Sequence, residues 1–297
     1  MMSQRDVLAE LCGHLGITPP SESQLDTVYR PLVTWVKAQC LTNPAFVLGI
    51  NGAQGSGKST LCHMLKTLLA HEGLSVAVLS IDDLYLTRRE RQSLAQDIHP
   101  LCAIRGVPGT HDVDLGLRLL NHLRALRHGD ALELPRFDKA RDDRRPETEF
   151  DAVVGPIDVV LFEGWCVGET PLLTYDGPFN EREARDDPEG IWSRWSLACL
   201  NDQYQSLNNA LDALIMIKVP SMETVRQSRW RQEKMLRERL GNLSDTEVLP
   251  GLMTKAEVFE YVELFERHTM HMFSDLPAHC QLVIHRDASY NFRMSWR

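Results

Sequence analysis

Several features that mark particular classes of protein are absent from the 297-residue sequence. No apolar run approaches the ~20 residues of a membrane-spanning helix. The first residues, MMSQRDVLAELCGHLG, lack the apolar core of a secretory signal. Positive charge is not in excess, because 32 Lys and Arg stand against 41 Asp and Glu, which gives a net charge of −9. A general nucleic-acid binder is more often basic, so we expect neither a membrane nor a nucleic acid as a partner.

Paired cysteines are also missing. The seven cysteines are scattered and odd in number, and no two have the C-x-x-C spacing of many zinc and redox sites. Small secreted domains that depend on disulfides are much richer in cysteine. We therefore expect reduced, mostly buried thiols in a cytoplasmic protein.

Glycine is sparse, with 18 in the chain, yet Gly52, Gly55 and Gly57 cluster within the segment VLGINGAQGSGKSTLCHML, residues 47–65. An apolar, β-favouring run precedes them and leucines at helical spacing follow, which indicates a strand-to-helix junction. Residues 52–59 fit G-x-x-x-x-G-K-[ST], the phosphate-binding P-loop. The alternative is a glycine-rich turn that matches by chance, and both flanks disfavour it.

The chemistry of a P-loop explains this composition. Residues without Cβ let backbone N–H groups surround phosphate oxygens closely, and the start of a helix adds a positive dipole. Lys58 is expected to reach the β- and γ-phosphates, and the Ser59 hydroxyl to ligate Mg²⁺. The predicted ATP-binding residues are Gly52, Ala53, Gln54, Gly55, Ser56, Gly57, Lys58, Ser59 and Thr60.

The rest of the chain alternates between short apolar runs and helical patterns. The expected strands lie at residues 46–51, 75–81, 159–163, 213–219 and 282–285. The expected helices lie at residues 3–15, 22–40, 59–71, 112–127, 201–211, 222–240 and 254–272. This pattern predicts an α/β fold with a P-loop NTPase-type parallel β-sheet flanked by helices on both faces.

Two further strand ends carry acids. In AVLSIDDLYLTRRER, a strand ends at Asp82 and Asp83, and ligands bind at the carboxyl ends of parallel strands. Asp82 is the expected base that accepts the proton of an attacking hydroxyl, with Asp83 structural. The alternative is that these acids only cap the next helix. In DVVLFEGW, Glu163 ends another strand and is expected to hold Mg²⁺, unless it is a chance acid there.

Five motifs occur in a fixed order: INGAQGSGKST, SIDDLYLT, RGVPGTHD, LPRFDKA and LFEGW. Together they resemble the D-glycerate 3-kinase family of plants and its fungal and bacterial relatives, which is similar to uridine kinase, phosphoribulokinase and bacterial pantothenate kinase. The resemblance implies a P-loop kinase fold, ATP, Mg²⁺, a small hydroxylated substrate and a base at Asp82. Leu84 stands where the family motif usually has an aromatic residue, and no family counterpart can be assigned to residues 171–195.

Basic and aromatic residues outside the P-loop are candidates for binding a carboxylate substrate. Guanidinium groups can grip a carboxylate with two hydrogen bonds. Simpler alternatives are that Asp112 caps a helix beside a solvent-facing histidine, and that LPRFDKARDDRRP is a solvated charged loop. The candidate substrate-binding residues are Asp82, Tyr85, Arg105, His111, Arg136 and Lys139.

The segment TVRQSRWRQEKMLRERL is helical and rich in arginine. The resemblance places it at the lid that closes over the γ-phosphate, where negative charge accumulates during transfer. Arg229 and Arg231 are therefore the candidate catalytic arginines, beside Asp82 and Lys58. The alternative is a surface helix in which Arg229 pairs with Glu233.

These observations predict an ATP-dependent small-molecule kinase, with D-glycerate phosphorylated at its 3-hydroxyl as the reaction that the resemblance favours. A nucleoside or pantothenate kinase is an alternative, as is a nucleotide-binding switch without an acceptor. We expect a helical N-terminal extension at residues 1–44 and a P-loop kinase domain at 45–297. Within it, residues 171–195 form a polar surface insertion, the lid helix spans about 222–240, and His268 and His271 lie incidentally on a core helix.

Overall fold

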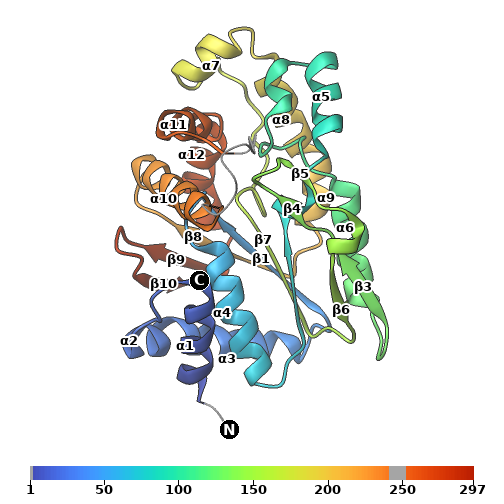
Figure 1. The fold of residues 1–297 in the computed structure, drawn as a ribbon, viewed down its shortest axis with the longest axis vertical. Coiled ribbons are helices and arrows are strands. Elements are labelled where there is room, and N and C mark those ends of the chain that lie inside the picture. Colours follow the sequence, from blue (N-terminus) through green and yellow to red (C-terminus); the bar gives the residue numbers. More distant parts are fainter. Residues whose placement is uncertain (1–2, 241–251) are drawn as a thin grey trace.

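The computed structural model describes residues 3–240 and 252–297. Residues 1–2 of the expected extension and 241–251 of the expected kinase domain lie outside the described residues. At its centre is a six-stranded sheet with the order β10-β9-β8-β1-β7-β2 (Figure 1). Five strands are parallel, and β10 pairs antiparallel with β9. The strands are β1 Phe46–Gly52, β2 Val76–Ser80, β7 Val159–Gly164, β8 Ala213–Lys218, β9 Leu282–Arg286 and β10 Phe292–Trp296. All five predicted strands are confirmed, and β10 was missed.

Helices cover both faces of the sheet because successive strand residues point to opposite sides. On one face, Phe46, Leu48 and Ile50 of β1 pack in a core with α1, α3 and α4. On the other face, Val47 belongs to a second core with α6, α8, α9 and α12. The predicted α/β architecture is therefore confirmed. The helices of the two layers are α1 Gln4–Leu15, α3 Arg30–Cys40, α4 Lys58–His71, α6 Val113–Ala125, α8 Ile191–Asn201, α9 Gln203–Asn208 and α12 Glu266–Asp275.

Several predicted helices differ in detail from the observed ones. The segment predicted as one helix at 22–40 is α2 Glu22–Gln24, a π-helical turn Leu25–Tyr29, and α3. The helix predicted at 201–211 is confirmed but shorter, as α9 at Gln203–Asn208, and α8 at Ile191–Asn201 was missed. The helix predicted at 254–272 is interrupted at 264–265, which separates α11, Lys255–Glu263, from α12. Helix α10 spans Met222–Leu240, and α5, Arg88–Asp97, was missed.

Residues 171–195 do not form a wholly exposed insertion. They include α7, Glu181–Asp186, and the first turn of α8. Glu183 is buried, and its carboxylate accepts hydrogen bonds from the buried Arg267 of α12. Most of the segment lies at the surface, as expected, but Glu183 does not, because it has a buried partner more than 80 residues away.

Two small hairpins project beside the main sheet. One pairs β3 Ala131–Leu134 with β6 Asp151–Val154, and the other pairs β4 Phe137–Asp138 with β5 Asp143–Arg144. We call the second the β4–β5 hairpin. It lies in the segment LPRFDKARDDRRP, for which the sequence left a solvated charged loop as the alternative. All seven cysteines are free thiols, and no helix in the described part of the chain is long and apolar enough to cross a membrane.

Candidate active site

The glycine-rich loop joins the end of β1 to the start of α4, as the sequence predicted. Gly55 and Gly57 have φ values of 71° and 101°, a region that favours glycine. A Cβ on Gly52 would lie 2.6 Å from the Ser56 Oγ atom. The backbone of Gly55 approaches α10 so closely that a Cβ there would lie 2.5 Å from that of Ser228. The loop is therefore a tight backbone cradle at a helix N-terminus, the form that binds phosphate groups.

Ser59 and Glu163 meet because β1 pairs directly with β7, with Ile50 beside Glu163. The Ser59 hydroxyl donates a hydrogen bond to Glu163 Oε1 at 2.6 Å. A hydroxyl and a carboxylate at the end of a phosphate loop are oxygen donors of the kind that Mg²⁺ prefers, so these residues fit that ion. Lys58 Nζ donates to the Ala53 carbonyl at 3.3 Å and so folds back over the loop.

Asp82 lies in a 3-10 turn, Ile81–Leu84, directly after β2, which is the neighbour of β7. Both of its carboxylate oxygens accept hydrogen bonds, from Tyr85 Oη at 2.9 Å and from Lys139 Nζ at 2.6 Å. Burial raises the pKa of Asp82, but the charge and hydrogen bond of Lys139 outweigh burial and, with Lys58, hold this pKa well below its usual range. Asp82 is thus an ionised carboxylate, and we call Asp82, Tyr85 and Lys139 the Asp82 cluster.

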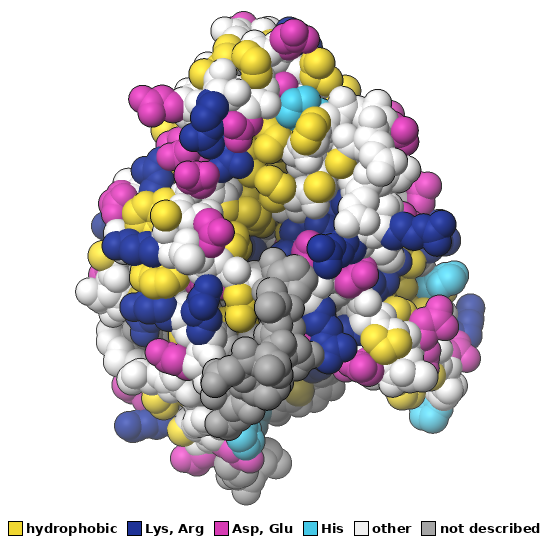
Figure 2. All heavy atoms as spheres, turned by 45° about the horizontal axis from the view of Figure 1, so that its top comes forward, with side chains coloured by type: hydrophobic (Ala, Val, Ile, Leu, Met, Phe, Trp, Pro, Cys, Tyr) yellow, Lys and Arg dark blue, Asp and Glu magenta, His cyan; other side chains and the backbone are white. Residues whose placement is uncertain are grey.

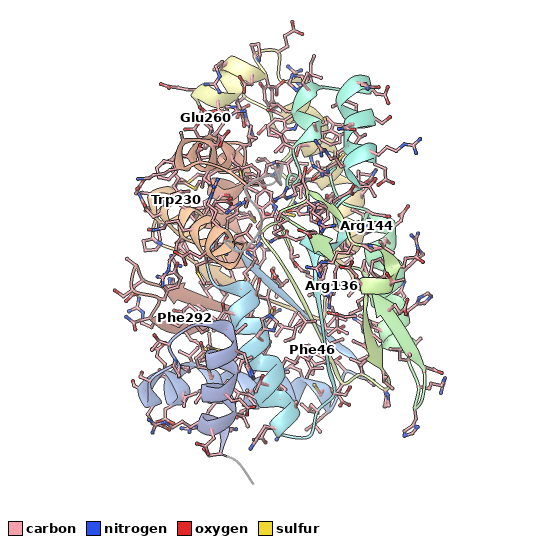
Figure 3. The ribbon with its side chains drawn as sticks, viewed as in Figure 1. Phe46, Arg136, Arg144, Trp230, Glu260 and Phe292 are labelled. Atoms are coloured by element: carbon pink, nitrogen blue, oxygen red, sulfur yellow. The ribbon has the colours of Figure 1, made fainter. Side chains whose placement is uncertain are left out.

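Asp83 has different partners from its neighbour. It accepts hydrogen bonds from Arg136 Nη1 at 3.0 Å and from the backbone N–H of Phe137 at 3.1 Å. Burial raises the pKa of Asp83 to about 6, against the opposing charge of Arg136. Arg136 directly precedes β4 and also pairs with Asp151 of β6. It therefore joins both small hairpins to the turn after β2. Figure 3 shows Arg136 and Arg144 on one side of the upper strand ends and Trp230 of α10 on the other.

His111 and Arg105 come from the same loop but have separate surroundings. The His111 side chain is only 4% exposed, its Nδ1 atom lies 2.5 Å from the Tyr204 hydroxyl, and its ring stacks on Tyr85. The solvent-facing alternative for His111 was therefore wrong. Burial lowers the pKa of His111 to about 4, so it is neutral at pH 7 and supports Tyr85. The other alternative is confirmed for Asp112, which caps α6.

The Arg105 guanidinium is buried and forms an ion pair with Asp142 at the turn of the β4–β5 hairpin. Its backbone carbonyl accepts a hydrogen bond from the Tyr261 hydroxyl of α11. Arg105, Asp142 and Tyr261 line part of a cavity of about 310 Å³. The face shown in Figure 2 is hollowed near its centre, where Lys and Arg side chains gather beside hydrophobic ones.

The two predicted lid arginines have different neighbours. Arg229 pairs with the buried Glu233 at 3.0 Å, as the alternative interpretation expected, and its guanidinium lies 5.8 Å from the centre of the Tyr261 ring. Arg231 lies over Tyr290, which is in the turn between β9 and β10. The structure therefore brings Arg229, but not Arg231, toward the Arg105 side of the site.

Sequence reasoning missed two buried groups. Arg286, at the end of β9, donates to the Gly55 carbonyl at 2.9 Å and to Ser228 Oγ at 3.0 Å. His268, expected to lie incidentally on a core helix, is buried on α12, and its Nδ1 atom lies 2.8 Å from the buried Glu169 carboxylate. Neither residue belongs to a sequence motif. The available signal for Arg286 was its position at the end of an apolar strand.

The fold and the site together define a P-loop nucleotide-binding protein, and comparisons with known proteins narrow the class. A family model described as "Methylmalonyl Co-A mutase-associated GTPase MeaB" matches residues 23–85, which contain the P-loop and β2. The "Uncharacterized kinase mug58" of Schizosaccharomyces pombe is 36% identical over 217 residues, covering 69% of this chain and 76% of that protein. The chloroplastic D-glycerate 3-kinase of Arabidopsis thaliana is 29% identical over 254 residues, 79% of this chain and 53% of that protein.

Solved structures share the fold. The D-glycerate 3-kinase from Cryptococcus neoformans has a TM-score of 0.62 at 24% identity, over 90% of this chain and 98% of that one. The YGR205w protein has a TM-score of 0.66 at 23% identity, over 100% and 99% of the two chains. The chain belongs to the P-loop kinase family that includes the fission yeast kinase and is related to D-glycerate 3-kinase and uridine kinase. It spans about half the length of the plant relative.

Proposed function

We propose that this protein is a Mg²⁺-dependent kinase that transfers the γ-phosphoryl group of ATP to an alcohol. The observation that carries the proposal is the order of three adjacent strand ends. The P-loop follows β1, Glu163 ends β7, and Asp82 follows β2. A phosphate cradle, a metal-binding acid and a base thus stand in a row at one edge of the sheet, where open α/β sheets bind ligands.

Each of these residues has a part in the transfer. The P-loop N–H groups and Lys58 bind the phosphates, and Ser59 and Glu163 would hold Mg²⁺, which would supply positive charge to offset the negative charge of the phosphates. Asp82 accepts the proton of the acceptor hydroxyl as its oxygen bonds to phosphorus, which is general-base catalysis. Of the two candidate lid arginines, Arg229, which lies beside Tyr261, is the one that we propose to act on the transferred group.

D-glycerate, converted to 3-phosphoglycerate, is the acceptor that we propose first. Support comes from the resemblance in the motifs and from the plant relative's activity as printed in its name. The cations Arg105, Arg136 and Lys139 meet around the β4–β5 hairpin, which suits a carboxylate. However, all three pair with acids of the chain itself, so a nucleoside or pantothenate is the second choice.

The test is a transfer assay with ATP, Mg²⁺ and a panel of hydroxy acids, nucleosides and pantothenate. We expect one alcohol to be phosphorylated with a kcat/KM at least tenfold above the others, and glycerate to be that alcohol. A folded Lys58→Ala variant is the control and should lose transfer. Hydrolysis of ATP without transfer to any acceptor would instead indicate the nucleotide switch.

A further inference from the structure

In the arrangement described here, each carboxylate oxygen of Asp82 accepts one hydrogen bond from the chain and keeps a second lone pair for another donor. Tyr85 carries a hydroxyl that can rotate, but Lys139 holds Asp82 Oδ2 with a charged donor at 2.6 Å. An acceptor hydroxyl can bond to one of the remaining lone pairs and give its proton to this carboxylate. Asp82 then loses the charge that holds Lys139.

Lys139 differs from the neighbouring cations in the identity of its acid partner. Arg136 pairs with Asp83 and Asp151, Arg105 with Asp142, and Arg229 with Glu233. These pairs stay charged throughout phosphoryl transfer. Among the described residues, the carboxylate that Lys139 binds is Asp82, the group that becomes neutral when it takes the proton. The step that transfers the negatively charged phosphoryl group thus also frees the charge of Lys139.

We propose that Lys139 is a further catalytic residue, which passes from Asp82 to the phosphoryl group as that group is transferred. This inference rests on the proposed kinase function. In the step, the acceptor oxygen bonds to the γ-phosphorus and its proton goes to Asp82. The bond from phosphorus to the β–γ bridging oxygen breaks, and its electron pair stays on ADP. Lys139 remains protonated and binds the oxygens of the moving group.

The geometry of the hairpin allows this movement of one side chain. The Lys139 side chain is 54% exposed and has four rotatable methylenes, so little packing is lost when it turns. The hairpin around it is held by Asp142, which binds Arg91 and Arg105, and by Arg136. The charge of Asp82 raises the pKa of Lys139, so this side chain stays an ammonium beside the base.

The competing role for Lys139 is to bind the acceptor's carboxylate, as the sequence suggested. Kinetics separate the two roles, because a contact made only in the transition state lowers kcat, whereas one that binds the acceptor equally throughout raises its KM. Lys139→Met removes the charge and Lys139→Arg keeps it. Lys66→Met, which removes an exposed lysine of α4, is the matched control.

With the best acceptor of the panel, we expect Lys139→Met to lower kcat by about 10²–10³, as the loss of one preorganised charge does elsewhere. The acceptor KM should change less than threefold, and Lys139→Arg should recover at least tenfold in kcat. The acid limb of the kcat/KM profile should move to higher pH in Lys139→Met, because Asp82 loses the cation that lowers its pKa.

A binding measurement gives a readout that does not depend on turnover. Lys139→Met should weaken the binding of MgADP with aluminium fluoride, a mimic of the transferring phosphoryl group, by at least tenfold, and leave MgADP alone unchanged. A raised acceptor KM with normal kcat would overturn the proposal in favour of acceptor binding. Normal kinetics and normal fluoride binding would overturn both roles. If wild-type protein phosphorylates no alcohol, the kinase function itself fails, and this inference fails with it.

Discussion

Asp82 and Asp83 are adjacent in the chain but differ in their electrostatic surroundings. Asp82 binds a lysine whose side chain is exposed enough to move, whereas Asp83 binds Arg136 and a backbone N–H of the β4–β5 hairpin. A carboxylate whose partner can leave suits a base, and one that anchors a hairpin suits a structural role. We therefore expect substitution of Asp82 to affect mainly catalysis and substitution of Asp83 to affect mainly stability.

Asp82→Asn should lower kcat by ~10²–10⁴, which is the usual contribution of a general base. The corresponding rise in the barrier is about 3–5 kcal/mol. ATP affinity depends on the P-loop, so the nucleotide Kd should change by no more than a few fold. Measurements of kcat and Kd test this. Near-normal kcat in Asp82→Asn would remove this residue from the chemistry.

Asp83→Asn should instead lower the melting temperature, because Arg136 loses a charged acceptor worth about 1–3 kcal/mol. Its effect on kcat should be smaller than that of Asp82→Asn. Thermal melts of both variants with wild type give the comparison. If Asp83→Asn loses activity while Asp82→Asn keeps it, the roles of the two residues are exchanged.

His111 makes the stability of the protein depend on pH. Its folded-state pKa, about 4, lies below the ordinary value of 6.5, so the unfolded chain binds more protons between these values. The stabilisation is complete above pH 6.5 and is lost as the pH falls toward 4. The difference is at most about 3 kcal/mol. We expect His111→Asn, which can still bind Tyr204, to lose less stability than wild type between pH 6.5 and 4.5.

Chemical denaturation at several pH values measures this difference. His111→Asn starts from a lower stability, because it loses the stacking on Tyr85, so the slope with pH is the quantity to compare. The exposed His14→Gln is the control and should follow wild type. Parallel curves for His111→Asn and wild type would contradict the assignment of a buried, neutral imidazole.

At the scale of elements, Arg286 connects β9, the P-loop and α10. Its side chain comes from β9, is 2% exposed, and binds both the Gly55 carbonyl and Ser228 of α10. It also lies 4.1 Å from the centre of the Tyr290 ring. The phosphate loop is thus tied to the helix that carries Arg229 and Arg231.

Arg286→Met should lower the stability by about 2–4 kcal/mol, because two buried acceptors lose a charged donor. It should also weaken MgADP binding severalfold, since the carbonyl of Gly55 is no longer held. Thermal melts and calorimetric titration measure the two effects. Arg293→Met, on the exposed side of β10, is the control and should behave as wild type. Wild-type melting and binding in Arg286→Met would show that the loop needs no such support.

Elements defined by local pattern could be predicted from the sequence, and those defined by distant partners could not. The P-loop and the strands ending at Asp82 and Glu163 show an apolar run followed by a functional residue, which a short window reveals. The β4–β5 hairpin looked like a charged loop because its order depends on pairs such as Arg136 with Asp83, 53 residues apart. The pair of His268 with Glu169 spans 99 residues and left no local signal.

At the scale of the whole molecule, the N-terminal extension is not a separate layer. Helices α1 and α3 lie beside α4 in Figure 1, and one continuous core contains residues from all three and from the sheet. The aliphatic side chains of the extension that are almost completely buried in this core are Leu8, Leu25, Val28, Leu32, Val33 and Val36. The extension therefore covers one face of the sheet and the apolar side of the P-loop helix.

We predict that residues 45–297 alone do not fold stably. Removal of the extension uncovers apolar side chains of the sheet and of α4, and each loses about 1.5–3 kcal/mol of burial. The net stability of a typical domain is only about 5–15 kcal/mol. Circular dichroism, thermal melting and MgADP binding of the truncated chain test this. In the full chain, Leu32→Ser should lower the melting temperature strongly, whereas Leu41→Ser, at a side chain 87% exposed, should not. Cooperative melting and nucleotide binding by residues 45–297 would mean that the P-loop domain is stable without the extension.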